Sequence, residues 1–474
     1  MTPLSAHDRI RSMSVALKRT TLISVFLTSF LTPFMGSAVN LAVPAIGAEF
    51  QARPLTLAWV VTSYLLSSAA FLLPFGRLAD VTGRRRVYLW GTALFAVTTL
   101  LCASASSIRM LILLRVLQGI AASMVFSTGT ALLASVYPSH QRGRALGATV
   151  AATYVGLSLG PVLGGVMTQN LGWRSIFLAT GPLAFGVLIF TALYLKEEWT
   201  GARGETFDLA GSAMYAVGLV ACLYGLSSIS TSAGGRYFLF AGLLLAGLLV
   251  LRESRLQFPI IPARLFRTNV TFAMSNLAAL INYSATFAVG FLMSLYLQLV
   301  LGYSPQTAGL ILISQPVMMA LFSPLAGALS DRVEARVVAS CGMALSTIGL
   351  FIFTFLTANG PTWLILANLA LLGLGFALFS SPNTNAIMGA VDKRLYGVAS
   401  SSLATMRVVG QAVSMSIVTL LLSVYVGQAH QLSASPDGLV TSMRAAFAGF
   451  TVISFGGIFA SLARGNMGHA GRSD

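Results

Sequence analysis

The sequence predicts an all-α integral membrane protein that crosses the bilayer fourteen times. Of its 474 residues, 56% are hydrophobic and only 9% are charged, which is typical of polytopic membrane proteins. A run of about 20 apolar residues can cross the bilayer as a helix. Such runs occur at residues 21–47, 57–76, 87–106, 108–135, 145–168, 174–195, 208–229, 236–252, 270–300, 306–328, 335–358, 361–389, 396–427 and 443–463.

The chain also repeats itself. The pattern Gly-x-Leu-x-Asp that runs from Gly76 to Asp80 recurs from Gly327 to Asp331, at an offset of 251 residues. Two homologous six-helix halves with an inserted helix pair explain this offset, and parallel halves are a transporter arrangement with a substrate site near the midplane. The predicted organisation is a cytoplasmic segment 1–20, an N-terminal half 21–200, an inserted pair 201–262, a C-terminal half 263–464 and a cytoplasmic tail 465–474.

The positive charges predict the orientation of the chain. Of the 29 Lys and Arg residues, 22 fall in alternate loops beginning with the N-terminal segment. Five lie in the opposite loops: Arg53, Arg109, Arg174, Arg236 and Arg444. The remaining two, Arg115 and Arg407, lie inside helices. Because positive loops are retained in the cytoplasm, both termini are expected there, in a prokaryotic cytoplasmic (inner) membrane. The net charge of +16 thus reflects topology, and no nucleic-acid partner is expected.

A short basic turn, residues 76–86, separates two of the apolar runs. It contains four arginines and one carboxylate, Asp80. Gly76 is expected to let two helices approach closely. Gly83 suits a tight turn with a positive φ.

Several motifs resemble those of the major facilitator superfamily, specifically its fourteen-helix drug:proton antiporter branch. The turn at residues 76–86 resembles the loop that marks the superfamily, and residues 115–122 (Arg-x-x-Gln-Gly-x-x-Ala) resemble its helix-four motif. Residues 172–177, 296–298 and 302–309 resemble the fourteen-helix branch. The helix-five motif associated with antiporters is matched by Gly147, Gly156, Gly160, Pro161, Gly164 and Gly165. The resemblance implies multidrug-type efflux by alternating access, energised by proton antiport.

The resemblance also implies a latch built on the repeated acids. Asp80 would lie at the start of the helix that begins near residue 396, supported by Arg394, and Asp331 at the start of the helix that begins near residue 145, supported by Arg144. A carboxylate is stabilised at a helix N-terminus. The alternative is a solvated loop charge, since exposed ion pairs are weak. The other expected gating residues in these turns are Gly76, Gly83, Arg84, Arg85 and Gly327.

The helix-five glycines predict a smooth packing stripe. Gly156, Gly160, Gly164 and Gly165 recur at roughly helical spacing, and Pro161 permits a bend because it lacks a backbone N–H. Such a stripe would let a neighbouring helix rock. The alternative is ordinary small-residue packing between membrane helices.

Arg115 and Arg407 are charges inside apolar runs, where an unpaired charge is costly and marks a functional group or a local partner. Arg115 either lines the cavity, near Asn40, or clamps backbone carbonyls; Arg407 either points into the cavity or snorkels to an interface. Polar side chains in the other apolar runs either line the cavity or join helices. The candidate substrate-binding residues are Asn40, Tyr64, Arg115, Gln118, Asn282, Gln315, Arg407 and Gln411.

The distribution of acids bears on the substrate. None of the 13 carboxylates and none of the four histidines lies in the middle of an apolar run. Neither a midplane proton carrier nor a counter-ion for a lipophilic cation is therefore visible. The sequence predicts a preference for neutral or anionic amphiphiles. Asp80, Asp331 and Asp208, at helix ends, are the remaining candidates for carrying protons.

The sequence thus predicts a secondary active exporter of small amphipathic compounds, not an enzyme, and expected to be monomeric. Two alternatives remain: an importer or facilitator of an anionic metabolite that uses Arg115 and Arg407, and a non-transporting membrane receptor or lipid-binding scaffold. No phosphate-binding Gly-Lys-Ser/Thr loop occurs. The three cysteines lie far apart in apolar runs, so neither a metal site nor a cofactor is expected.

Overall fold

The computed structural model describes residues 6–137, 139–202, 204–230, 232–253, 256, 263–330, 332–391, 395–426 and 436–464. Asp331, Arg394 and the tail 465–474 lie outside these residues. The side chain of Arg144 lies outside them as well. The predicted latch contacts of these residues therefore stay predictions.

The regular secondary structure of the described residues is all helical, and fourteen of the helical spans are long and apolar enough to cross a membrane. This confirms the predicted fold class. The first half contains α1 (Ala6–Phe50), α2 (Pro54–Thr82), α3 (Arg84–Ala103), α4 (Ile108–Val136), α5 (Ser139–Leu171) and α6 (Arg174–Tyr194). The inserted pair is α7 (Leu209–Ser228) and α8 (Ala233–Glu253). The second half contains α9 (Ala263–Thr268), α10 (Val270–Thr286), α11 (Val289–Leu295), a π-helical turn (Tyr296–Val300), α12 (Pro305–Leu312), α13 (Ser314–Ser330), α14 (Ala335–Phe353), α15 (Thr362–Gly389), α16 (Tyr396–Tyr425) and α17 (Pro436–Leu462).

Two differences from the sequence prediction concern where a helix begins and how regular it is. α1 begins at Ala6, well before the apolar run at residue 21, because residues 6–20 contain neither Pro nor Gly and no residue that ends a helix. The predicted run 270–300 is not one regular helix. It is interrupted by a turn at residues 287–288 and ends in the π-helical turn.

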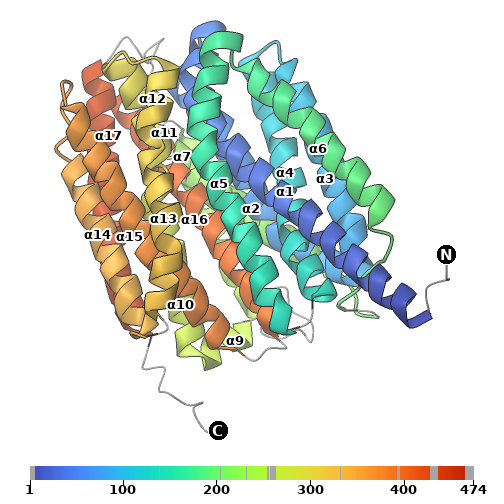
Figure 1. Ribbon diagram of the computed structural model, residues 1–474. Helices are drawn as coiled ribbons and strands as arrows, with labels where there is room; N and C mark the ends of the chain where they lie inside the picture. Colours follow the sequence, from blue (N-terminus) through green and yellow to red (C-terminus); the bar gives the residue numbers. More distant parts are fainter. Residues whose placement is uncertain are drawn as a thin grey trace.

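The helices form two bundles that pack against each other (Figure 1). In the first bundle α1 packs on α5, α2 on α4 and α3 on α6; in the second, α10 packs on α16, α13 on α15 and α14 on both α15 and α17. α7 and α8 pack on each other, and α7 also contacts α2 and α16. The inserted pair therefore touches both halves.

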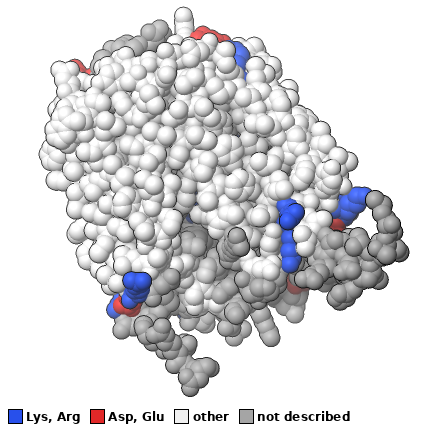
Figure 2. Space-filling model, viewed as in Figure 1, with Lys and Arg blue, Asp and Glu red and all other residues white. Residues whose placement is uncertain are grey.

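An even number of crossings places the start of α1 and the end of α17 at the same end of the molecule (Figure 1). We call this the basic end, because the arginine-rich turn between α2 and α3 lies there, and the other end the opposite end. Lys, Arg, Asp and Glu side chains appear near the two ends in Figure 2, with an uncharged band between them. That band matches the hydrocarbon region of a bilayer.

Candidate substrate site and gates

A polar cluster joins the two halves near the middle of the bundle. The Tyr154 hydroxyl on α5, in the first half, donates a hydrogen bond of 3.2 Å to Ser380 Oγ on α15, in the second half. Tyr283 on α10 lies close to both Ser380 and Arg407, the latter on α16. We call Tyr154, Tyr283, Ser380 and Arg407 the central cluster. All four side chains are partly exposed in the described structure.

The depth of the central cluster follows from the helix spans. Each of its residues lies within about five residues of the centre of its span, or about 7 Å along the axis. All are displaced from the centre toward the basic end. Next to Tyr283 in the chain is Asn282, a predicted site residue that is fully buried, and both atoms of its amide lack a hydrogen-bond partner in the described structure. A buried amide without a hydrogen-bond partner is costly, and in this structure the Asn282 side chain is closed to a ligand.

The predicted residues Arg115, Gln118 and Tyr64 meet elsewhere, inside the first half. Arg115 is 1% exposed; its Nε donates to the carbonyl of Val60 on α2 (3.0 Å), and its NH1 to Gln118 Oε1 (2.6 Å). Gln118 in turn donates to Thr99 Oγ1 (2.7 Å). The guanidinium lies over the Tyr64 ring, 4.3 Å from its centroid. These are the contacts of a clamp between α2 and α4, and they do not involve Asn40.

The other predicted site residues lie on α1, α13 and α16. Asn40 on α1 is 9% exposed and its Oδ1 has no hydrogen-bond partner among the described residues. Gln315 on α13 and Gln411 on α16 are partly buried. The structure therefore brings Arg407 and Asn282 near Tyr283, and it separates them from the Arg115 group. Tyr154 and Ser380 were missed, because one tyrosine or serine in an apolar run gives no signal of its own.

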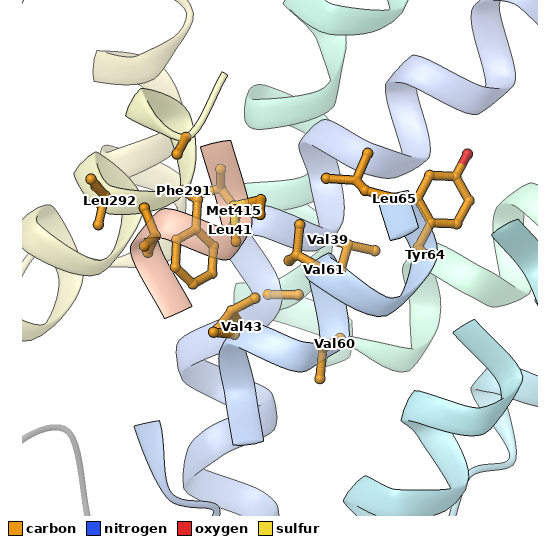
Figure 3. Packing of buried hydrophobic residues seen from close by; sticks show 14 of the residues in the cluster. Val39, Leu41, Val43, Val60, Val61, Tyr64, Leu65, Phe291, Leu292 and Met415 are labelled. Atoms are coloured by element: carbon orange, nitrogen blue, oxygen red, sulfur yellow. The ribbon is translucent and has the colours of Figure 1, made fainter. Parts of the chain in front are cut away.

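Apolar side chains close the interface between the halves toward the opposite end. Leu41 on α1, Val61 on α2, Phe291 on α11 and Met415 on α16 are all 4% exposed or less and belong to one buried cluster (Figure 3). We call these four residues the apolar plug. Phe291 follows Tyr283 by eight residues, and Met415 follows Arg407 by eight residues. At the rise of an α-helix, eight residues correspond to about 12 Å. The plug therefore separates the central cluster from the opposite end.

Close contacts of α2 and α5 with the second half reinforce this closure. Thr62 on α2 and Thr419 on α16 share a hydrogen bond of 3.2 Å. A Cβ atom built on Gly165 of α5 would lie 2.5 Å from the Pro305 carbonyl oxygen, and one built on Gly309 of α12 would lie 2.2 Å from that of Pro161. Only glycine permits this approach of the two backbones.

The glycine stripe of α5 therefore has two different partners. A Cβ atom on Gly156, Gly160 or Gly164 would collide with α1 of the same half, at 2.5–2.7 Å from Phe30, Ser37 or Ala38. Gly165 alone among the four faces the second half. Most of the predicted stripe thus packs α5 tightly on α1. The surface between halves is built at Pro161 and Gly165.

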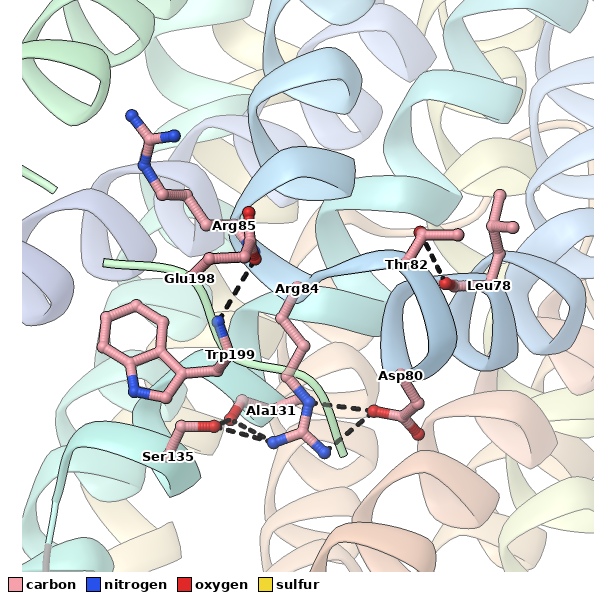
Figure 4. Close-up of polar contacts among 9 residues, drawn as sticks. All are labelled: Leu78, Asp80, Thr82, Arg84, Arg85, Ala131, Ser135, Glu198 and Trp199. Atoms are coloured by element: carbon pink, nitrogen blue, oxygen red, sulfur yellow. Dashed lines mark hydrogen bonds and ion pairs between the residues drawn. The ribbon is translucent and has the colours of Figure 1, made fainter. Parts of the chain in front are cut away.

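The basic turn is held by contacts within the first half (Figure 4). The Asp80 carboxylate accepts from Nε of Arg84 at 2.8 Å, and Arg84 donates further to Ser135 Oγ on α4 at 2.7 Å. Gly83 has a φ of +128°, which confirms the predicted positive φ. The close approach expected at Gly76 is not found, because a Cβ there would lie 3.5 Å from the side chain of Ser127, an ordinary contact distance. At Gly327 a Cβ would lie 2.8 Å from Ser381 Oγ.

The segment after α6 binds to this turn through hydrogen bonds and an ion pair. The sequence did not predict these contacts. Glu198 accepts hydrogen bonds from the backbone N–H groups of Arg85 (2.8 Å) and Arg86 (3.1 Å), in the first turn of α3. Arg77 forms an ion pair with Glu205. A carboxylate at a helix N-terminus satisfies N–H groups that have no partner inside the helix. The connection to the inserted pair therefore also caps α3.

Asp208 begins the inserted pair. Its carboxylate caps α7 by accepting a hydrogen bond of 3.0 Å from the backbone N–H of Gly211. The same carboxylate forms a bidentate ion pair with Arg252 at the end of α8. The hydrogen bond from Arg252 is the main reason that the pKa of Asp208 is lowered from its ordinary value, although partial burial opposes it. Asp208 therefore stays ionised at neutral pH, which makes it a poor proton carrier.

Repeated six-helix halves that cross a membrane and meet at a mid-depth polar cluster define a secondary transporter. The particular family follows from comparison with known proteins. The family model of the Major Facilitator Superfamily matches residues 25–250 and 276–469, and the chain belongs to this superfamily. Several similar proteins are named as resistance or export proteins, which confirms the resemblance to the drug:proton antiporter branch.

Two relatives and one solved structure illustrate the similarity. The chain is 31% identical to the riboflavin transporter RibZ of Clostridioides difficile over 81% of its own length and 84% of that protein. It is 32% identical to the multidrug resistance protein Stp of Mycobacterium tuberculosis over 88% of its length and 79% of that protein. A crystal structure of a bacterial homolog to the human lysosomal transporter Spinster, inward-facing and unoccupied, shares the fold with a TM-score of 0.68 at 15% identity, covering 94% of this chain and 97% of that one.

Proposed function

We propose that this protein exports small amphipathic compounds across a prokaryotic cytoplasmic membrane by proton antiport with alternating access. The single observation that carries the proposal is the central cluster, in which side chains of both halves meet around Arg407 at mid-depth. Substrate bound there would contact both halves, and it could therefore bias their relative tilt. The export and resistance proteins among the relatives support outward transport.

The orientation of the molecule agrees with loading from the cytoplasm. Loops rich in Lys and Arg remain cytoplasmic, so the basic end with both termini is proposed to face the cytoplasm. The apolar plug lies between the central cluster and the opposite end. This arrangement is then the inward-facing state, which takes up substrate from the cytoplasm or the inner leaflet.

The preferred substrates are proposed to be neutral or anionic amphiphiles. Arg407 brings a positive charge to the central cluster, and no carboxylate lies mid-helix in the sequence. A lipophilic cation would find no counter-ion there, whereas a carboxylate or an electron-rich ring can bind the guanidinium. The low pKa of Asp208 leaves Asp80 and Asp331 as the proposed residues for proton coupling.

The test is transport by purified protein in proteoliposomes with an imposed pH gradient. We expect gradient-driven transport of neutral and anionic amphiphiles to exceed that of quaternary ammonium compounds. Arg407→Gln should reduce transport of anions by tenfold or more and of neutral compounds less. The matched control is Arg109→Gln, which removes an exposed arginine at the opposite end. Faster transport of quaternary ammonium compounds than of weak acids would contradict the substrate proposal.

A second candidate function is an importer or facilitator of an anionic metabolite. The naming of RibZ as a riboflavin transporter favours this alternative, because that name does not describe drug export. The same vesicles separate the two functions: a facilitator carries its substrate only to equilibrium and ignores the pH gradient. Loss of gradient-driven export in Asp80→Asn, with a normal rate of substrate exchange, would assign proton coupling to Asp80.

A further inference from the structure

Prolines inside α1 and α5 leave particular backbone carbonyls without their usual helical partner. A proline has no N–H to donate to the carbonyl four residues earlier. Pro33 and Pro44 of α1 therefore free the carbonyls of Ser29 and Asn40, and Pro161 of α5 frees that of Leu157. In a membrane a free carbonyl must be satisfied by a neighbouring group.

Two of the freed carbonyls are satisfied inside the first half, in a reciprocal way. The Thr153 hydroxyl on α5 is shared between the Ser29 carbonyl of α1, at 3.3 Å, and the Thr149 carbonyl of its own helix, at 3.1 Å. Ser37 on α1 donates to the Leu157 carbonyl of α5 at 3.4 Å. Together with the glycine contacts, these bonds join α1 and α5 into one unit that need not change when the halves tilt.

The third freed carbonyl is satisfied from the other half. The hydroxyl of Ser294, on α11, donates to the Asn40 carbonyl at 2.8 Å. The Gln298 amide donates to Ser294 Oγ at 2.9 Å and to the neighbouring Leu41 carbonyl at 3.1 Å. Ser294 is fully buried, and the bonds lie next to Leu41 of the apolar plug. Any tilt that opens the opposite end has to break them.

The segment that carries these donors is interrupted at both of its ends. α11 is only seven residues long, preceded by the turn at residues 287–288 and followed by the π-helical turn that contains Gln298. Such interruptions weaken the regular ladder of helical hydrogen bonds and often mark functional positions. Ala288, at the first interruption, donates its N–H to Ser414 Oγ on α16 at 3.1 Å, which keeps that end of α11 on the second half.

We propose that Ser294 and Gln298 are the gating residues of the opposite end, and that they close it by binding the carbonyl that Pro44 frees at Asn40 and the adjacent carbonyl of Leu41. Proline supplies an acceptor that is available in every state, so the gate can form and break without disturbing the helical bonds of α1. The gate holds for transport in either direction. It therefore goes beyond the proposed export function and does not depend on the substrate.

The experiment measures access to the apolar plug in full-length protein reconstituted in vesicles. Val61→Cys is labelled with a membrane-impermeant maleimide from the side of the opposite end, and the unmodified chain with its three native cysteines gives the background. Loss of one interhelical hydrogen bond should shift the equilibrium by roughly threefold to tenfold. We therefore expect Ser294→Ala, and separately Gln298→Met, to raise the labelling rate of the introduced cysteine by that factor, and Ser294→Thr to preserve the original rate.

Thr153→Val is the matched control, because it removes a hydroxyl that caps a proline-freed carbonyl within one half. It should leave the labelling rate unchanged. The gate is refuted if both Ser294→Ala and Gln298→Met label at the original rate, or if Thr153→Val accelerates labelling as much as they do. Failure of the export proposal would give a different result: the transport assays would show another substrate preference, while Ser294→Ala and Gln298→Met would still raise the labelling rate.

Discussion

Tyr154 and Ser380 connect the two halves of this transporter at mid-depth, through a hydrogen bond of 3.2 Å between α5 and α15. Ser380 also lies close to Tyr283, which is near Arg407, so the bond joins the first half to the surroundings of Arg407. A change of tilt between the halves has to alter this contact. The pair is thus placed where substrate binding and domain movement can be coupled.

Replacement of Tyr154 by Phe should weaken this connection. The change removes one hydroxyl and leaves the ring, so we expect an intact fold, with a loss of about 1 kcal/mol in the bond itself. Transport assays should show an altered apparent KM. A double-mutant cycle with Ser380→Ala measures the coupling. Strictly additive effects of the two changes would show that the bond makes no contribution to transport.

Arg115 and Arg407 should respond differently to the same substitution. Arg115→Met leaves the Val60 carbonyl and Gln118 Oε1 without their donor in a buried site, which should destabilise the protein by about 2 kcal/mol or more. Arg407→Met, at a partly exposed position, should preserve the melting temperature but impair transport of anions. Thermal unfolding in detergent and vesicle transport, measured on both variants, check the contrast. Equal losses of stability would contradict it.

The two glycines of the basic turn offer a matched pair. Gly83→Ala forces a side chain into a φ of +128° and toward the Glu198 carboxyl carbon, 2.6 Å from the new Cβ. We expect a loss of about 1–3 kcal/mol. Gly76→Ala adds a methyl at an ordinary contact distance and should cost little. The measurement is the melting temperature of each variant; a larger loss for Gly76→Ala would refute the assignment.

The ion pair of Asp208 with Arg252 should contribute a pH-dependent stability. Because the pKa of Asp208 is lowered in the folded protein, its contribution is fully present above the unfolded-state pKa of about 3.9. It is lost as the pH falls from there through the folded-state pKa. Asp208→Asn should therefore lower the melting temperature at pH 7, with a difference from the original protein that shrinks below about pH 4. A difference that stays constant down to pH 2 would exclude this linkage.

The predicted latch depends on residues beyond those that the structure describes. The bonds of the Asp80 carboxylate are to Arg84 in the first half, and the partner expected for it across the interface, Arg394, is not described. In the proposed alternating-access cycle, the interface described here is closed toward the opposite end, so a latch at the basic end is expected in the other state. Asp80 therefore remains a predicted gating residue.

The sequence by itself determined the fourteen crossings, the two halves, the basic turn and the positive φ at Gly83. Hydropathy, charge placement and a turn glycine act over a few neighbouring residues, so a linear pattern is enough to predict them. It also predicted Arg407 and Asn282 as site residues, because polar groups inside apolar runs are conspicuous.

Only the tertiary structure decided what those groups touch. It directed Arg115 to the Val60 carbonyl, brought Tyr154 to Ser380, fastened Glu198 to the start of α3 and placed Ser294 against the carbonyl freed by Pro44. The partners in these four contacts are separated by 55, 226, 113 and 254 residues along the chain. Hydrogen bonds depend on distances of about 3 Å between atoms, and only the packing of helices sets such distances between segments so far apart in sequence.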